Sequence, residues 1–273
     1  MKLKTLCSAV ALAVGMAGAA HAYPQFSVNE TPYGGSSQTG DEFGFNYNTT
    51  LTLNTGGTFS EVGGVTFTSL AHETASGQQP NTGSVIGRSI GSPVSTGYFL
   101  FGNIVSSTGT YVPVSGGFSG TFKSLTLDLY IQSATLGKPG VTANDQYLTT
   151  NATLLATAAL DGNVTSDAQY LSCAQNSNQC GAWAVNTTFN KPLSTAFLAF
   201  FTNPTNFYLD LHSGGQNNGP ITAPTSLPAT VTDTGHGTAY FAVPEPASLT
   251  LLGGGLLLGG LAARRKKKRT QAA

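Results

Sequence analysis

The first residues to examine are those that could do acid–base, nucleophilic or metal chemistry. Outside the first 22 residues the histidines are His72, His212 and His236, and none stands at an HExxH or HxH spacing. Asp233-Thr234-Gly235 has the form of an aspartic-protease triplet, but that chemistry needs two facing carboxylates and the triplet occurs once, in a stretch that reads as a loop. No G-x-S-x-G elbow, P-loop or dinucleotide-binding glycine pattern is present. We therefore predict no catalytic, cofactor-binding or metal-binding residue.

Paired carboxylates are harder to judge, because the two acids of a glycosidase can lie far apart in the chain. The stretch from Tyr23 to Ala242 contains eleven acids, and none stands in an aromatic cluster with His or Arg. The sole tryptophan, Trp183, follows Cys180 closely. Such a tryptophan either stacks on a sugar or packs over a disulfide. A secreted carbohydrate-active enzyme or a dedicated carbohydrate-binding module therefore stays open as the alternative function.

Two cysteines, Cys173 and Cys180, remain once Cys7 is assigned to the leader described below. Six polar residues separate them, and an even pair in an oxidising compartment favours a disulfide. On the loop-entropy model it would contribute roughly 2–3 kcal/mol to stability. The rival is a zinc site, which needs further ligands, and no His or other Cys lies nearby. We predict the disulfide.

The elements that must position these residues read as β-strands throughout. Apolar residues recur at every second position, which on a sheet puts them all on one face. Gly-Gly, Asp-Gly, Asn-Pro and Gly-Pro steps separate the runs. Many short strands between turns predict an all-β body over 23–242, an antiparallel β-sandwich or jelly roll. The alternating residues are Phe43, Phe45, Tyr47, Leu51, Leu53, Val65, Phe67, Phe99, Phe101, Leu125, Leu127, Leu129, Ile131, Phe207, Leu209 and Leu211.

Three segments of the body are assigned differently. Residues 151–160 are rich in Ala and Leu and fit a short helix as well as a strand, since Thr residues interrupt them. Residues 75–93 and 214–234 are polar and rich in Gly, Pro, Asn and Ser, which is typical of loops. A last strand is expected over 238–243.

The first 22 residues have the pattern of a secretory signal peptide. Lys2 and Lys4 precede an apolar run, and Ala20-His21-Ala22 fits an A-x-A cleavage site. Cleavage between Ala22 and Tyr23 would make Tyr23 the mature N-terminus. We therefore expect the body to be exported.

Charge is divided unevenly along the chain. It has 12 basic and 12 acidic residues overall, but between Tyr23 and Val243 there are only four cations against eleven acids, a net charge of −7. An acidic body with scattered cations has no electrostatic footprint for nucleic acid. No nucleic-acid partner is expected.

The C-terminal end combines three features. Val243, Pro244, Glu245 and Pro246 precede an uncharged apolar run of 17 residues over 247–263, and a basic block of six cations ends the segment: Arg264, Arg265, Lys266, Lys267, Lys268 and Arg269. As a helix the run would be about 25 Å long, the short limit for crossing a bilayer core of about 30 Å. The basic block suits a cytoplasmic flank. Gly255 and Gly259 have a GxxxG spacing that could pair two helices, but we interpret them as part of a glycine-rich membrane segment. We expect one short membrane helix.

This combination resembles the PEP-CTERM protein-sorting signal, and it covers about the last thirty residues (domain 243–269). The resemblance implies that an exosortase-type membrane enzyme reads and cuts the tail. It further implies that the inner membrane holds an intermediate, and that the product reaches the surface or extracellular matrix of a Gram-negative bacterium that makes exopolysaccharide. The Lys-rich basic block departs from the family's usual preference for Arg.

The mature start, Tyr23 to Thr31 followed by Tyr33-Gly34-Gly35, resembles that of flocculation-associated PEP-CTERM proteins. The resemblance covers about a dozen residues and carries over no catalytic or ligand residue. It implies a non-catalytic role in floc or biofilm cohesion. The expected partners are exopolysaccharide or other surface proteins.

Overall fold

A computed structural model of the chain describes residues 25–74, 77–86, 96–114, 117–161, 167–171, 181–190, 192–203, 210–217 and 226–242. All of them belong to the first of two compact units, Met1–Ala242 and Val243–Ala273. The strands are β1 (Phe26–Asn29), β2 (Ser37–Gly40), β3 (Glu42–Asn54), β4 (Thr58–Thr74), β5 (Gly77–Pro80), β6 (Tyr98–Val114), β7 (Gly117–Ser133), β8 (Thr153–Leu160), β9 (Asp167–Leu171), β10 (Gly181–Phe189), β11 (Phe201–Asn203), β12 (Asp210–Asn217) and β13 (Ala229–Ala242). The helices are α2 (Thr195–Phe200) and two 3₁₀ turns, Thr31–Tyr33 and Ala134–Leu136.

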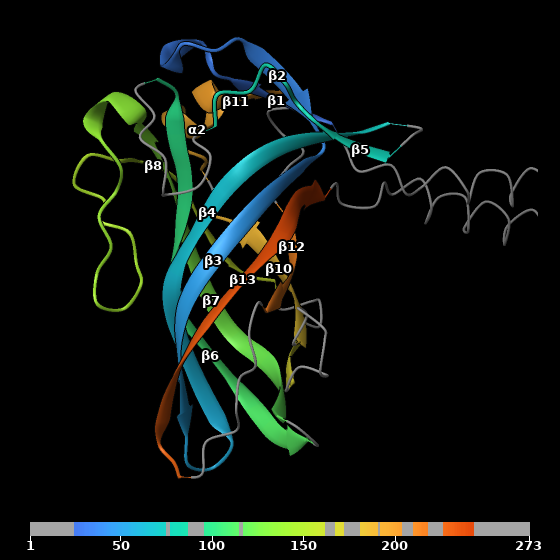
Figure 1. The fold of residues 1–273 in the computed structure, drawn as a ribbon, viewed down its shortest axis with the longest axis vertical. Helices are drawn as coiled ribbons and strands as arrows, with labels where there is room; N and C mark the ends of the chain where they lie inside the picture. The colour runs from blue at the N-terminus through green and yellow to red at the C-terminus, as the bar shows by residue number, and fades with distance from the viewer. Residues whose placement is uncertain are drawn as a thin grey trace, which may run out of the picture. The chain divides into compact units, whose positions relative to one another are not determined.

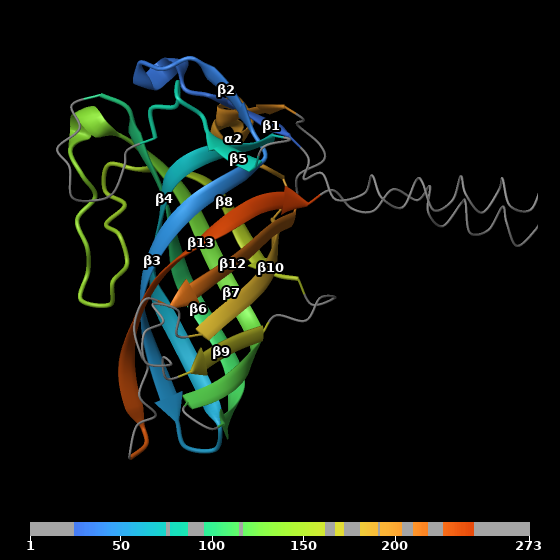
Figure 2. The same cartoon turned by 45° about the vertical axis from the view of Figure 1, so that its right-hand side comes forward.

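Ten of these strands form one antiparallel sheet that closes on itself (Figures 1 and 2). The neighbours run β12-β13-β3-β4-β6-β7-β8-β10, and β10 pairs again with β12. We call these eight strands the closed sheet. β8 and β9 both lie between β7 and β10. Each pairs with both of those strands, but β8 pairs with one part of them and β9 with another. β5 pairs with the end of β4.

The prediction of an antiparallel all-β body is confirmed, but the arrangement differs from the expected sandwich or jelly roll. Those folds have two facing sheets with free edges, whereas here the pairing of β12 with β10 removes the edges. The strands are long, up to 17 residues in β4, β6 and β7. Irregular register at several points, including Glu61/Gly63 and Ile104/Ser106, adds the bends that a closed sheet requires.

The alternation of apolar residues predicts the buried face correctly along most strands. On β3 the residues Phe43, Phe45, Tyr47, Leu51 and Leu53 are each at most 6% exposed. The predicted leucines of β7 are at most 8% exposed and belong to the same core. Residues 153–160, left open between helix and strand, form β8. The 214–234 region, expected to be a loop, contains the end of β12 and the start of β13.

A second, three-stranded sheet and a short helix lie over one end of the closed sheet, at the top of Figures 1 and 2. Its strand order is β11-β1-β2, and it packs through aromatic rings. The ring centroid of Phe26 lies 4.8 Å from that of Phe43 and 5.0 Å from that of Phe241. Ser194 caps α2 by accepting a hydrogen bond from the Phe197 amide. This end of the closed sheet is therefore filled by side chains.

Residues 137–150 form a long loop that packs on the outer side of the closed sheet. Tyr147 is its anchor: Thr66 donates a 2.5 Å hydrogen bond to the Tyr147 hydroxyl, and the Tyr147 backbone exchanges two hydrogen bonds with Asn103. Phe99 and Phe101 are buried in this outer cluster and not inside the closed sheet. Period-two alternation therefore marks a buried face, and does not say which side of the sheet is covered.

Candidate functional site

A cavity of about 60 Å³ lies inside the closed sheet. Its wall is mostly apolar, with a small group of polar side chains on one part of it. The lining residues are Phe45, Tyr47, Thr49, Glu61, Val65, Phe67, Ile104, Phe122, Leu125, Leu127, Trp183, Val185, Thr187, Leu211 and Ser213. An apolar cavity with a few convergent polar groups is the usual form of a small-molecule site.

Two buried carboxyl groups belong to this part of the interior. Glu61 on β4 lines the cavity and is 6% exposed, and Asp233 on β13 is 2% exposed. β3 lies between those strands, and Asp233 faces Thr49 across the β13–β3 pair. Thr49 also hydrogen-bonds the Glu61 side chain. The two acids therefore flank one strand with a shared neighbour.

Tyr47 connects Asp233 to the cavity wall. Its hydroxyl donates to the Asp233 carboxyl group, and the indole N–H of Trp183 donates to the Tyr47 oxygen. The backbone N–H of Thr234 also bonds Asp233. Even so, Asp233 Oδ2 is buried and has no hydrogen-bond partner. A buried polar atom without a hydrogen-bond partner is costly.

Burial raises the pKa of both carboxyl groups. The pKa of Glu61 rises to about 7, because burial disfavours the charged form more than the hydrogen bond from Thr49 favours it. The pKa of Asp233 rises to about 8 through burial and the nearby charge of Glu61, partly offset by the bonds from Thr234 and Tyr47. Burial, Asp233 and Glu61 also raise the pKa of Tyr47. Among the residues that the structure places around the cavity, no lysine, arginine or histidine compensates the two acids.

Three aromatic rings form one side of the cavity. The centroid of the Trp183 ring lies 5.8 Å from that of Phe45 and 5.5 Å from that of Tyr47. Gly215 leaves room for the indole, because a Cβ there would lie 2.7 Å from the Trp183 ring. Trp183 thus contributes to the cavity wall, and not to an exposed sugar-stacking surface as one prediction had it. The other prediction, that Trp183 packs over a Cys173–Cys180 disulfide, involves residues outside the described ranges.

Sequence reasoning missed Asp233. It was assigned to a loop and set aside, whereas it lies within β13 and points to the same side as the buried Ala239 and Phe241. The sequence does contain a signal for this. The odd-numbered positions from Val231 to Phe241 all face inward, but Gly235 and Gly237 and the threonines between them obscure the alternation. Glu61 is likewise in phase with Phe59 and Val65.

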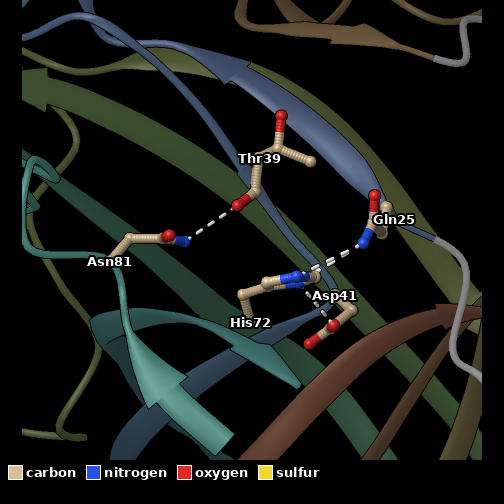
Figure 3. Close-up of polar contacts among 5 residues, drawn as sticks. All are labelled: Gln25, Thr39, Asp41, His72 and Asn81. Atoms are coloured by element: carbon tan, nitrogen blue, oxygen red, sulfur yellow. Dashed lines mark hydrogen bonds and ion pairs between the residues drawn. The ribbon is translucent and has the colours of Figure 1, made fainter. Parts of the chain in front are cut away.

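A second polar group lies near the start of the described chain, shown in Figure 3. His72 Nδ1 lies 3.0 Å from Asp41 Oδ2, and Gln25 Nε2 lies 3.4 Å from each ring nitrogen. Nearby, Asn81 donates a 3.0 Å hydrogen bond to the Thr39 carbonyl. These contacts join the segment before β1 to the ends of β3 and β4. Among the described residues, no group of three or more His, Cys, Asp or Glu side chains could hold a metal ion.

The residues predicted to direct export and sorting, and those predicted to form a disulfide, lie outside the described ranges. This holds for the sorting motif Val243 to Pro246, the basic block at 264–269, the cleavage site at Ala22 and Tyr23, and Cys173 and Cys180. Where the chain is described, no helix has both the length and the apolar character needed to cross a membrane. The predicted membrane segment at 247–263 lies outside the described residues.

Comparison with known proteins identifies the C-terminal end. A family model for the PEP-CTERM protein-sorting motif matches residues 242–266. The match begins one residue before Val243 and ends inside the basic block, so it covers all three features recognised in the sequence. No curated protein and no solved structure is significantly similar to the chain. The chain therefore carries a PEP-CTERM sorting signal, which implies export, processing by an exosortase-type enzyme, and a surface or extracellular location.

Proposed function

We propose that this protein is a non-catalytic component of the surface or extracellular matrix of a Gram-negative bacterium, where it promotes cohesion of flocs or biofilm with exopolysaccharide. The observation that carries the proposal is the sorting signal at 242–266, which begins at the last residue of β13. A body that ends where the signal begins can be separated from it without losing an element of its sheet.

The outer face of β13 supplies a polar surface for this role. Thr230, Thr232, Thr234 and Thr238, which we call the threonine row, are all exposed. Alternate residues of a strand are about 7 Å apart, so Thr230, Thr232 and Thr234 present uncharged hydroxyl groups at a regular spacing, and Thr238 follows beyond the exposed His236. Each hydroxyl group both donates and accepts hydrogen bonds, as polysaccharide hydroxyls do. Single contacts of this kind are weak, and many copies held in one matrix add them together.

The cavity does not favour the alternative of a polysaccharide-cleaving enzyme. An apolar cavity of about 150 Å³ is one that binds benzene, and a pyranose ring with its hydroxyl groups is larger than benzene. The cavity here is about 60 Å³. A cavity of this size is too small to hold a sugar unit beside the Glu61 carboxyl group.

The test is a strain in which the gene is deleted and then restored. We expect the deletion to reduce floc or biofilm cohesion and the full chain to restore it. A chain in which Thr230, Thr232 and Thr234 are all changed to Val should restore it only in part, because valine keeps the strand shape but removes the hydroxyl groups. The matched control changes the same three residues to Ser, which retains them. Unchanged cohesion in the deletion strain would refute the proposed role.

Binding by the purified body, incubated with the host's own polysaccharide, separates the alternatives. Multivalent cohesion predicts weak retention that rises when the body is displayed in many copies. Saturable binding by single copies would favour a dedicated binding module. New reducing ends in the polysaccharide would identify an enzyme.

A further inference from the structure

The polar part of the cavity wall includes hydrogen-bond acceptors that a ligand could use. The Tyr47 hydroxyl is fully used, since it donates to Asp233 and accepts from Trp183. The Thr187 hydroxyl donates to the Leu211 carbonyl at 3.2 Å, which leaves only its lone pairs for a ligand. Glu61 contributes a carboxyl group to the wall, and behind Tyr47 the Asp233 Oδ2 atom has no donor at all. A ligand that carries N–H or O–H donors can bond the Glu61 carboxyl group and the lone pairs of the Thr187 hydroxyl.

The acidic groups inside the closed sheet favour a positively charged ligand. The titratable groups that face this region are Tyr47 on β3, Glu61 on β4 and Asp233 on β13. The described lining residues from β6, β7, β10 and β12 include none. Two acids near each other in an apolar interior favour a bound cation, because the cation offsets both their burial and their mutual repulsion.

The aromatic side and the volume limit what that cation can be. Phe45, Tyr47 and Trp183 present ring surfaces, which attract an ammonium group and also accept an alkyl group. The volume of about 60 Å³ is less than half that of the cavity of about 150 Å³ that holds benzene, so the occupant must have fewer non-hydrogen atoms than benzene. A bare metal ion would lack ligands here, whereas a few non-hydrogen atoms fit.

We propose that the cavity binds a small primary alkylammonium ion, of the size of methylammonium or ethylammonium, with its N–H groups on the Glu61 carboxylate and its alkyl group against the rings of Phe45, Tyr47 and Trp183. This assignment is independent of the proposed role in cohesion.

Binding of such a cation is coupled to proton release. The free protein holds protons on carboxyl groups whose pKa values are about 7 for Glu61 and about 8 for Asp233. A bound cation favours the ionised forms, so these protons leave when it binds. Affinity therefore rises as the pH increases from 6 to 8, in the range where an alkylammonium ion stays charged.

The fluorescence of Trp183 can be used to measure this binding. Trp183 is the only tryptophan in the protein and lines the cavity, so its fluorescence reports on occupancy. We would titrate the mature protein with ethylammonium chloride, and with ethanol and sodium acetate as neutral and anionic ligands of matched size. The proposal predicts a saturable change in fluorescence with ethylammonium alone, and proton release measured by calorimetry in buffers of different ionisation enthalpy. An equal response to ethanol, or no saturable response to ethylammonium, would overturn it.

Two variants test whether the ammonium ion binds at Glu61. Glu61→Gln keeps the size of the side chain but removes the charge, and should weaken ethylammonium binding at pH 8 by about tenfold or more, the effect of losing one hydrogen bond to a charged group. Asp41→Asn is the matched control, since Asp41 is also a buried acid but lies with His72 away from the cavity. Equal loss in both variants would overturn the assignment. If Glu61→Gln does not give a folded protein by circular dichroism, the comparison of ethylammonium with ethanol and the proton release still decide.

Discussion

Replacing Glu61 with glutamine tests the description of the interior through stability. Burial raises the pKa of Glu61 from 4.5 to about 7, so the folded protein keeps a proton that the unfolded chain gives up. The stabilisation that this proton represents is complete below about pH 4.5 and is lost as the pH rises through about 7. The wild type therefore becomes less stable between those limits.

The magnitude follows from the same values. Each pKa unit corresponds to about 1.4 kcal/mol, so a rise from 4.5 to about 7 makes the loss for Glu61 about 3 kcal/mol by pH 8. Glutamine does not titrate, and it resembles the protonated acid in shape. We expect Glu61→Gln to match the wild type within about 1 kcal/mol at pH 5. At pH 8 it should be more stable by about 3 kcal/mol, which is roughly 6–12 °C in Tm for a body of this size.

The assay is urea unfolding at pH 5 and pH 8, followed by circular dichroism and by the fluorescence of Trp183. Asp41→Asn again serves as the control, and should not reproduce a gain in stability at pH 8. A wild type that becomes more stable from pH 5 to pH 8, or a Glu61→Gln effect of the same size at both values, would refute the reasoning about the buried acids.

Three further predictions concern the rest of the body. Ser194→Ala removes the cap of α2 and the hydrogen bond to the Leu155 carbonyl, and should lower the free energy of unfolding by about 1–2 kcal/mol, measured in urea. Tyr98→Phe removes the 2.7 Å bond to the fully buried Glu30, and should cost about 1–3 kcal/mol in the same measurement; no loss would mean that Glu30 is satisfied without it. A thiol assay on the unfolded, unreduced mature protein should find no reactive thiol at Cys173 and Cys180, and two reactive thiols would rule out the predicted disulfide.

The strand content and most of the buried face were predictable from local pattern. Residues such as Phe45, Tyr47 and Leu51 stand at alternate positions, and on a sheet that periodicity marks one buried face. Closure was not predictable, because sandwiches and closed sheets share the same alternation. It depends on the pairing of β10 with β12, which opposes Thr187 to Leu211 and has no signature in either segment alone.

The interior site was missed for a related reason. Asp233 lies among Thr and Gly residues, which are typical of loops, and its burial comes from strands distant in the sequence. Gly237 illustrates this: a Cβ there would lie 2.7 Å from the Phe45 ring, so the glycine serves packing and not a turn. The sorting signal is the opposite case, because its three parts are contiguous and need no fold to be recognised.

The central claim is that the C-terminal signal delivers a self-contained β body to the cell surface or matrix. The most direct test is the intact mass of the protein recovered from the matrix, compared with that from a strain lacking the exosortase-type enzyme. We predict that the wild-type product begins at Tyr23 and has lost the apolar run and basic block, and that the other strain keeps the full C-terminal end in its membrane fraction. A matrix protein that retains residues 247–269, or the same mass and location in both strains, would contradict the account.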